Sequence, residues 1–265
     1  MYETRQILEV MAKDPKGLRV IPTFRCKKGC KFCYQRTTEG NILNLDTLKT
    51  ILDDLKLAKF RPMYVTMQGG EVMEVPNIED YVDAVDKVFP EARKTVTTNG
   101  MHGIERYRAL NRVGVHSFSF SLHKTQRRME QWEWLVTDKI LDLASNPFFT
   151  VRVNCFLDEA NFENWRGVYE FCKGKNIPLT LCTDMRKEIA NEDRMDLLQW
   201  INTSLGIEAE VRTYNYYAVI MPKGSDYRFW VFFHSHSYEH DNIIVLPNGK
   251  VTTDYQSVVD CEGAD

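Results

Sequence analysis

The alternation of short β-rich runs with helix-period segments constrains this chain more than any other feature of its sequence. Six β-rich runs lie between Gly17 and about Asp184, and amphipathic segments separate them. The predicted strands are residues 18–24, 63–68, 94–98, 115–122, 150–157 and 177–183. Strand–helix units in series are typical of parallel strands joined by right-handed crossovers. The sequence therefore predicts a barrel or a doubly wound sheet.

The segments between the strands have helical periodicity, with apolar residues three and four positions apart. Three such stripes are Leu48/Ile51/Leu52/Leu55, Ile78/Tyr81/Val82/Val85 and Trp165/Val168/Tyr169/Cys172. We expect each stripe to pack on the sheet, which assigns Cys172 to the core. A further helix is predicted at about 188–204.

The second to sixth predicted strands each have a polar face. In the fourth strand, Phe118, Phe120 and Leu122 alternate with Ser117, Ser119, Ser121 and His123. Helices cover the outward face of a (β/α) barrel, so that face must be apolar and the polar face must point inward. Polar groups are costly to bury without partners, which predicts a wet, ligand-filled interior. An antiparallel sheet with one solvated face is the alternative, and the intervening helices disfavour it.

A loop with three cysteines directly follows the first predicted strand. Cys26, Cys30 and Cys33 lie in the segment CKKGCKFC, whereas the other four cysteines are scattered. Thiolates are the ligands that iron–sulfur clusters select, and three of them can hold three irons of a cubane and leave the fourth open. The basic residues Arg25, Lys27, Lys28 and Lys31 would offset the negative charge of such a cluster. A zinc loop is disfavoured because no further CxxC or HxxxH pair lies within reach in sequence to complete the ligand set.

The CX3CX2C spacing, with an aromatic residue before the last cysteine, resembles the radical S-adenosylmethionine (SAM) superfamily. MQGGE at 67–71 is similar to the GGE motif of that family, and TTNG at 97–100 to its TNG segment. The resemblance covers about residues 17–185. It implies an α/β fold, a partial (β/α)6 TIM-like barrel with a small C-terminal α+β extension. It also implies one [4Fe–4S] cluster held by Cys26, Cys30 and Cys33, with SAM as the second cofactor.

The resemblance further implies which residues bind SAM. The expected contacts are the backbone of Phe32 near the adenine, Gly69, Gly70 and Glu71 at the amino group, Asn99 in the TNG segment, and Ser121 and Asn154 at the ribose or carboxylate.

The chemistry implied by the family is reductive cleavage of SAM. One electron from a low-potential donor, of flavodoxin or ferredoxin type, enters the cluster. The resulting 5′-deoxyadenosyl radical abstracts hydrogen from a peptide or small-metabolite substrate. A glycyl-radical enzyme activase is an alternative with the same chemistry, and the additional β-rich extension ranks it lower. A non-catalytic metal-binding module is an alternative of another class, which would not cleave SAM when reduced.

The C-terminal part changes to short strands and turns at 205–255, including a predicted hairpin, IIVLPNGKVTT. It looks like a remnant of a SPASM/Twitch-type segment without the auxiliary-cluster cysteines, because only Cys261 is present. We therefore expect a single cluster. The expected division is an N-terminal helical segment at 1–16, the radical SAM barrel at 17–187 and a substrate-covering extension at 188–265. The residues expected to cover the substrate are Tyr214, Tyr216, Tyr217, Trp230, His234 and His236.

Single residues near the predicted strand ends have two interpretations each. Cys182 is a candidate hydrogen-atom donor to a substrate radical or an unreactive thiol. Arg186, close to Asp184, can clamp a carboxylate or face solvent. His234, His236 and His240 form an HxHxxxH string that fits either a metal site or polar edge-strand positions.

Composition and charge limit the partners. The net charge of −3 gives no reason to expect a nucleic-acid backbone as ligand. No run of about 18 apolar residues occurs, and the segment MYETRQILEVMAKD lacks the apolar core of a signal peptide. We therefore expect no membrane span and a cytoplasmic location.

Overall fold

The computed structural model describes residues 4–30, 32–33, 40–123, 131–157, 162–184, 189–233, 241–254 and 258. The helices are α1 (Thr4–Met11), α2 (Leu45–Leu57), the 3-10 turn η1 (Val72–Glu74), α3 (Ile78–Val88), α4 (Ile104–Arg112), α5 (Gln131–Ala144), α6 (Phe162–Gly174) and α7 (Asn191–Leu205). The strands are β1 (Gly17–Val20), β2 (Tyr64–Met67), β3 (Arg93–Thr98), β4 (Ser117–Ser121), β5 (Thr150–Phe156), β6 (Leu179–Cys182), β7 (Ala209–Thr213), β8 (Tyr217–Pro222), β9 (Phe229–Phe232), β10 (Asn242–Val245) and β11 (Val251–Thr252). All six strands predicted before Asp184 are present.

The chain forms two compact units, and the boundary between them falls within β4. The first unit contains residues 1–118 and 239–265, and the second contains residues 119–238. The expected division at 187/188 stays a prediction. β7, β8 and β9 join the sheet of the second unit, whereas β10 and β11 join that of the first.

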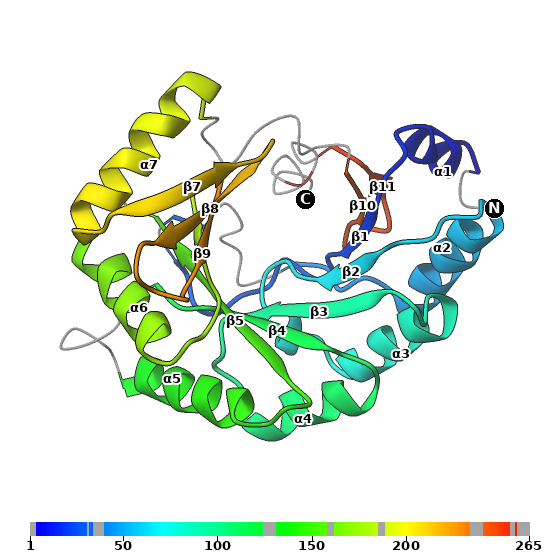
Figure 1. The fold of residues 1–265 in the computed structure, drawn as a ribbon. Coiled ribbons are helices and arrows are strands. Elements are labelled where there is room, and N and C mark those ends of the chain that lie inside the picture. Colours follow the sequence, from blue (N-terminus) through cyan, green and yellow to red (C-terminus); the bar gives the residue numbers. More distant parts are fainter. Residues whose placement is uncertain are drawn as a thin grey trace. The chain divides into compact units, whose positions relative to one another are not determined.

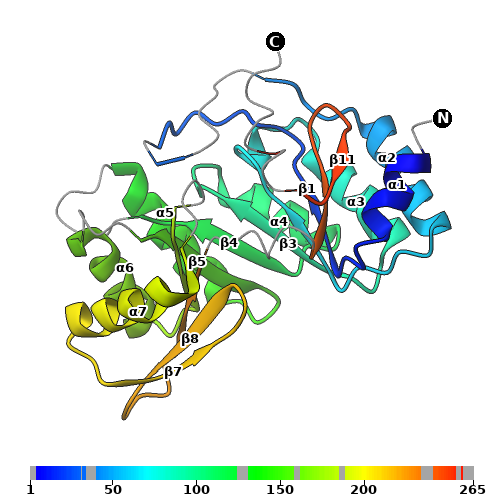
Figure 2. The same cartoon turned by 90° about the horizontal axis from the view of Figure 1, so that it is seen from above.

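In the first unit the strands follow the order β11-β10-β1-β2-β3. β1 pairs in parallel with both β2 and β10, β2 pairs in parallel with β3, and only β11 runs antiparallel. Helices α2, α3 and α4 lie along one face of this sheet (Figure 1). The short helix α1 packs beside α2 and β11, as Figure 2 also shows. The predicted hairpin is confirmed as β10–β11, and its pairing with β1 was not anticipated.

In the second unit the strand order is β5-β6-β9-β8-β7. β5, β6 and β9 are parallel, and β7, β8 and β9 form an antiparallel meander. Helices α5 and α6 pack against β5, and α6 also contacts β6 (Figure 1). Parallel strands alternating with helices confirm the predicted α/β class, and the antiparallel alternative with one solvated face is wrong.

The apolar strand faces and helix stripes form the core, as predicted. Phe118, Phe120, Leu179 and Leu181 are fully buried, and the stripes on α2, α3 and α6 are buried as well. The polar face is drier than expected, because Ser117 and Ser119 are buried as well. The Ser117 hydroxyl lies 2.7 Å from that of Thr95, so the burial cost is met by a protein partner instead of water. The expectation of a wet interior is therefore wrong at the start of β4.

A buried lysine in β3 ties that strand to the end of α3. The side chain of Lys94 is 2% exposed, and its ammonium lies 2.6 Å from a carboxylate oxygen of Asp86. It also donates to the carbonyls of Pro90 and Ala92, at 3.1 and 3.0 Å. These contacts satisfy all three ammonium donors.

We expect Lys94→Met to lower the free energy of unfolding by about 2–3 kcal/mol, because it leaves three acceptors without their donor. Asp86 is 40% exposed and can regain water, which keeps the loss below that of a fully buried pair. Lys87→Met is the matched control, since Lys87 pairs with Asp83 on the exposed face of α3. Urea unfolding should leave the control unchanged. Equal midpoints for the two variants would contradict the role assigned to Lys94.

Candidate active site

The cysteine loop leaves the carboxyl end of β1. Cys26, Cys30 and Cys33 are all partly exposed and none forms a disulfide. The loop is tight: Gly29 has a left-handed φ of 59°, and the Cys33 amide donates to the Cys30 carbonyl at 3.0 Å. Three accessible thiols on one short loop fit the donor set of an iron–sulfur cluster. Among the described residues, however, no three His, Cys, Asp or Glu side chains already converge as a metal cage.

The glycines after β2 pack directly against the start of this loop. A Cβ on Gly70 would lie 2.2 Å from the carbonyl oxygen of Arg25, and one on Gly69 would lie 2.6 Å from that of Thr23. Gly69 also has a φ of 138°, which disfavours any side chain. The Gly70 amide donates to the Thr23 carbonyl at 2.9 Å. Both glycines are therefore required for the close approach of two backbones.

Glu71 is fully buried, and its carboxylate is engaged by the protein itself. It accepts hydrogen bonds from the Asn99 amide at 2.6 Å, the Thr98 hydroxyl at 2.8 Å and the Met73 amide at 3.1 Å. Its own amide donates to the Arg25 carbonyl at 2.6 Å. Burial raises the pKa of Glu71, and the three hydrogen bonds oppose that shift. Glu71 thus joins the cysteine loop to the end of β3, and its expected contact with SAM stays a prediction.

Asn99 connects this network to a cysteine. Its side-chain oxygen accepts from the Met101 amide at 2.9 Å, and its side-chain nitrogen lies 3.8 Å from the Cys26 sulfur as a hydrogen-bond donor. The parallel register of β1, β2 and β3 explains the arrangement, because it brings the segments after all three strands to one edge of the sheet.

Two residues of this network were not singled out from the sequence. Thr98 bonds Glu71 and also accepts from the Gly100 amide at 3.1 Å. Glu74 lies 3.3 Å from the ammonium of Lys27 and 3.7 Å from His102. Glu74 therefore pairs with a basic residue of the cysteine loop itself. The TTNG motif contained the signal for Thr98, whereas nothing in the sequence pattern pointed to Glu74.

Three other predicted residues lie in the second unit. Ser121 ends β4 and Asn154 lies in β5, where its carbonyl accepts from the Leu122 amide at 3.0 Å. Cys182 ends β6, with Phe156 as its register partner in β5. All three residues are partly exposed, and they lie towards the carboxyl ends of neighbouring strands. Although part of Cys182 is exposed, its sulfur is desolvated, which raises the pKa of the thiol to about 12, so it keeps its hydrogen at neutral pH.

Aromatic residues of the predicted extension continue this edge. β9 pairs in parallel with β6, which places Trp230 opposite Thr180 and Phe232 opposite Cys182. The ring of Tyr216 lies 5.9 Å from that of Phe232, and Tyr214 stacks on Tyr217 at 4.5 Å. The structure thus places Trp230 in one sheet with Cys182 and groups the three tyrosines at the turn from β7 to β8. Arg186, His234, His236, His240 and Cys261 lie outside the described residues.

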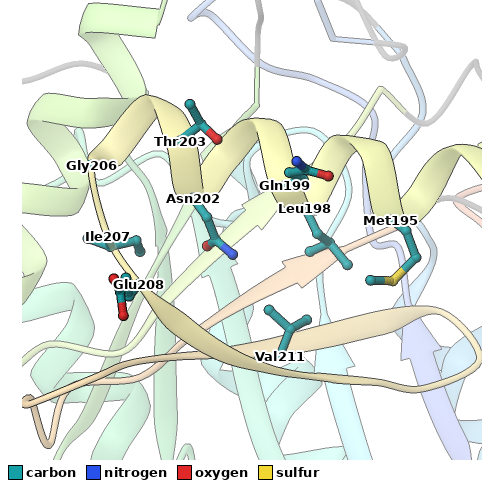
Figure 3. A pocket seen from close by; sticks show the side chains of 9 residues that line it. All are labelled: Met195, Leu198, Gln199, Asn202, Thr203, Gly206, Ile207, Glu208 and Val211. Atoms are coloured by element: carbon teal, nitrogen blue, oxygen red, sulfur yellow. The ribbon is translucent and has the colours of Figure 1, made fainter.

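A separate pocket of about 480 Å³ lies between α7 and β7 (Figure 3). Apolar side chains of Leu198, Ile207 and Val211 line it together with Gln199 and Asn202. None of the predicted site residues is among its lining.

No helix in the described part of the chain is long and apolar enough to cross a membrane.

Parallel β/α units with a three-cysteine loop after the first strand define a class of enzymes built for iron–sulfur chemistry. A family model described as "Radical SAM superfamily" matches residues 20–201. The chain therefore belongs to the radical SAM superfamily, whose members use a [4Fe–4S] cluster and SAM. The predicted family and cofactors are confirmed at this level.

Curated relatives match part of the chain. A GTP 3′,8-cyclase of Aquifex aeolicus is 30% identical over 129 residues, which cover 47% of this chain and 40% of the relative. A GTP 3′,8-cyclase of Mycobacterium ulcerans is 25% identical over 207 residues, which cover 72% of this chain and 56% of the relative. The chain thus spans about half the length of these relatives.

Solved structures match almost the whole chain. Streptococcus suis SuiB bound to S-adenosylmethionine is 13% identical, with a TM-score of 0.67 over 95% of this chain and 64% of SuiB. SuiB bound to the precursor peptide SuiA has a TM-score of 0.65 and 14% identity over 98% of this chain and 64% of SuiB. The likeness establishes the fold and confirms the predicted partial TIM-like α/β architecture.

Proposed function

We propose that this protein reductively cleaves SAM at one [4Fe–4S] cluster bound by Cys26, Cys30 and Cys33. The observation that carries the proposal is the bridge made by Glu71, which fixes the cysteine loop through Arg25 and the TTNG segment through Asn99. When bound, the cluster supplies the electron that cleaves SAM into methionine and a 5′-deoxyadenosyl radical. A reductant of flavodoxin or ferredoxin type supplies that electron.

The residues of this chain bind and orient the cofactors. The Glu71 carboxylate is occupied by three protein donors, so the backbone of Gly69 and Gly70 is the part of the motif best placed to receive the SAM amino group. Phe32 lies in the cysteine loop, next to Cys33, and its backbone is the proposed contact for the adenine of SAM. The contacts of Ser121 and Asn154 with SAM are proposals that rest on the family resemblance.

The proposed substrate is a peptide, with a small metabolite as the second candidate. The likeness to SuiB, which is described with its precursor peptide, extends over 98% of this chain. The GTP 3′,8-cyclases favour a nucleotide, and the Aquifex match covers 47% of this chain. Anaerobic reconstitution with deuterated peptides or with deuterated GTP separates the two classes. Deuterium in 5′-deoxyadenosine identifies the substrate, and SAM turnover without transfer from any peptide would count against a peptide.

The position of Trp230 in β9 leads to a prediction about how tightly SAM cleavage is coupled to substrate conversion. Trp230→Ala should retain the cluster and SAM cleavage but lose at least about tenfold in substrate conversion, because an incompletely covered radical is quenched by water and stray hydrogen donors. Trp200→Ala is the matched control, since Trp200 packs on Trp165 between α7 and α6. The ratio of 5′-deoxyadenosine to product is the measurement. An unchanged ratio in Trp230→Ala would confine the β-rich extension to a scaffolding role.

A further inference from the structure

We infer that Asn99 tunes the reduction potential of the cluster by donating a hydrogen bond to the Cys26 sulfur. The inference rests on the proposed function, because it requires Cys26 to be a cluster ligand. The observation is the side-chain nitrogen of Asn99 at 3.8 Å from the Cys26 sulfur. Asn99 was expected to contact SAM, whereas in the structure its side-chain amide faces the Cys26 sulfur.

The orientation of the Asn99 amide follows from its other partner. An asparagine side chain has one acceptor end and one donor end, which the hydrogen-bond network must distinguish. The Met101 amide is a donor and lies 2.9 Å from the Asn99 oxygen. Because only the oxygen can accept that hydrogen bond, the NH2 group faces Cys26.

Both partners are anchored on the same residue, Glu71. The backbone amide of Asn99 donates to the Glu71 carboxylate at 2.6 Å. The backbone amide of Glu71 donates to the carbonyl of Arg25, which directly precedes Cys26. Asn99 is 8% exposed, so little water competes with its side chain. The donor is therefore held beside the sulfur before any cluster binds, and the hydrogen bond costs little further ordering.

Hydrogen bonds to the ligating sulfurs are one of the factors that set the potential of an iron–sulfur cluster. Reduction adds an electron, so the sulfur carries more negative charge and the hydrogen bond strengthens. Loss of the donor should favour the oxidised state. We expect the one-electron reduction equilibrium to shift about tenfold, equivalent to about 59 mV in the negative direction.

The experiment is an EPR-monitored redox titration of the reconstituted protein and two variants. Asn99→Leu removes the donor at similar size. Asn99→Asp keeps the oxygen that accepts from Met101, removes the donor and adds negative charge, so its shift should be at least as large. Asn111→Leu is the matched control: Asn111 lies in α4 of the same unit, and its side-chain nitrogen donates to the Val115 carbonyl at 2.8 Å.

The expected order of potentials is unsubstituted protein and Asn111→Leu highest, Asn99→Leu lower and Asn99→Asp equal to it or lower. Unchanged potentials in both Asn99 variants, with the cluster fully loaded, would overturn the inference and leave the proposed function intact. Loss of the cluster from both variants would assign Asn99 to cluster assembly and would also overturn it. Absence of a cluster from the unsubstituted protein would instead refute the proposed function.

Discussion

Replacement of Cys26, Cys30 and Cys33 by alanine is expected to abolish cluster binding and SAM cleavage completely. The reconstituted protein should carry about four irons per chain, as one cubane requires, and the triple variant close to none. All three cysteines lie on the loop after β1, and the side chains of Cys155 and Cys172 are fully buried. The bound iron, the EPR signal of the reduced protein and the formation of 5′-deoxyadenosine should therefore all be lost together.

Cys155→Ala and Cys172→Ala, combined in one protein, provide the matched control. Both thiols are part of the core, and burial raises the pKa of Cys172, so neither is available as a thiolate ligand. This double variant should keep its iron and its SAM cleavage at some cost in stability. A content near eight irons in the unsubstituted protein, or an intact cubane in the triple variant, would contradict the single three-cysteine site.

Local patterns of the sequence predicted the elements, but long-range pairing was beyond them. The strands before Asp184 were found because each combines β-rich residues with alternating faces, and observed ends differ from predicted ones by at most four residues. The turn at Asn248-Gly249 indicated a hairpin. A turn sequence indicates that the two strands it joins pair with each other, but it carries no information about which other strand lies next to the hairpin in the sheet. The parallel pairing of β10 with β1 was missed for that reason.

The residues of the candidate site were easier to select than their partners. The GGE and TTNG segments were recognised as motifs, and the parallel register explains why they lie at one edge. The sequence could not show that the Glu71 carboxylate accepts hydrogen bonds from Thr98 and Asn99, because those donors lie 27 and 28 residues further along the chain. Nor could spacing show that the Asn99 side chain turns to Cys26, since that depends on the Met101 amide.

Glu71→Ala is expected to weaken both the fold and the binding of SAM. The substitution leaves the buried amides of Met73 and Asn99 without an acceptor, and each orphaned donor costs about 1–3 kcal/mol. The free energy of unfolding should fall by about 2–5 kcal/mol in total. SAM affinity should fall roughly 10- to 150-fold, the equivalent of about 1.5–3 kcal/mol, as the Gly69–Gly70 backbone loses its support. Unchanged affinity by calorimetry of the folded variant would remove Glu71 from the site.

Glu71→Gln separates the charge of this residue from its shape. Burial raises the pKa of Glu71 above its ordinary value of 4.5, so the folded protein binds the proton more tightly than the unfolded chain. The stability that this difference contributes is fully present below pH 4.5 and is lost as the pH rises through the folded pKa. Glutamine does not titrate. The free energy of unfolding of the unsubstituted protein, measured relative to Glu71→Gln, should therefore fall as the pH is raised from 4.5 towards neutrality. A rise over the same range would mean that the hydrogen bonds from Asn99, Met73 and Thr98 outweigh the cost of burial and hold the carboxylate ionised.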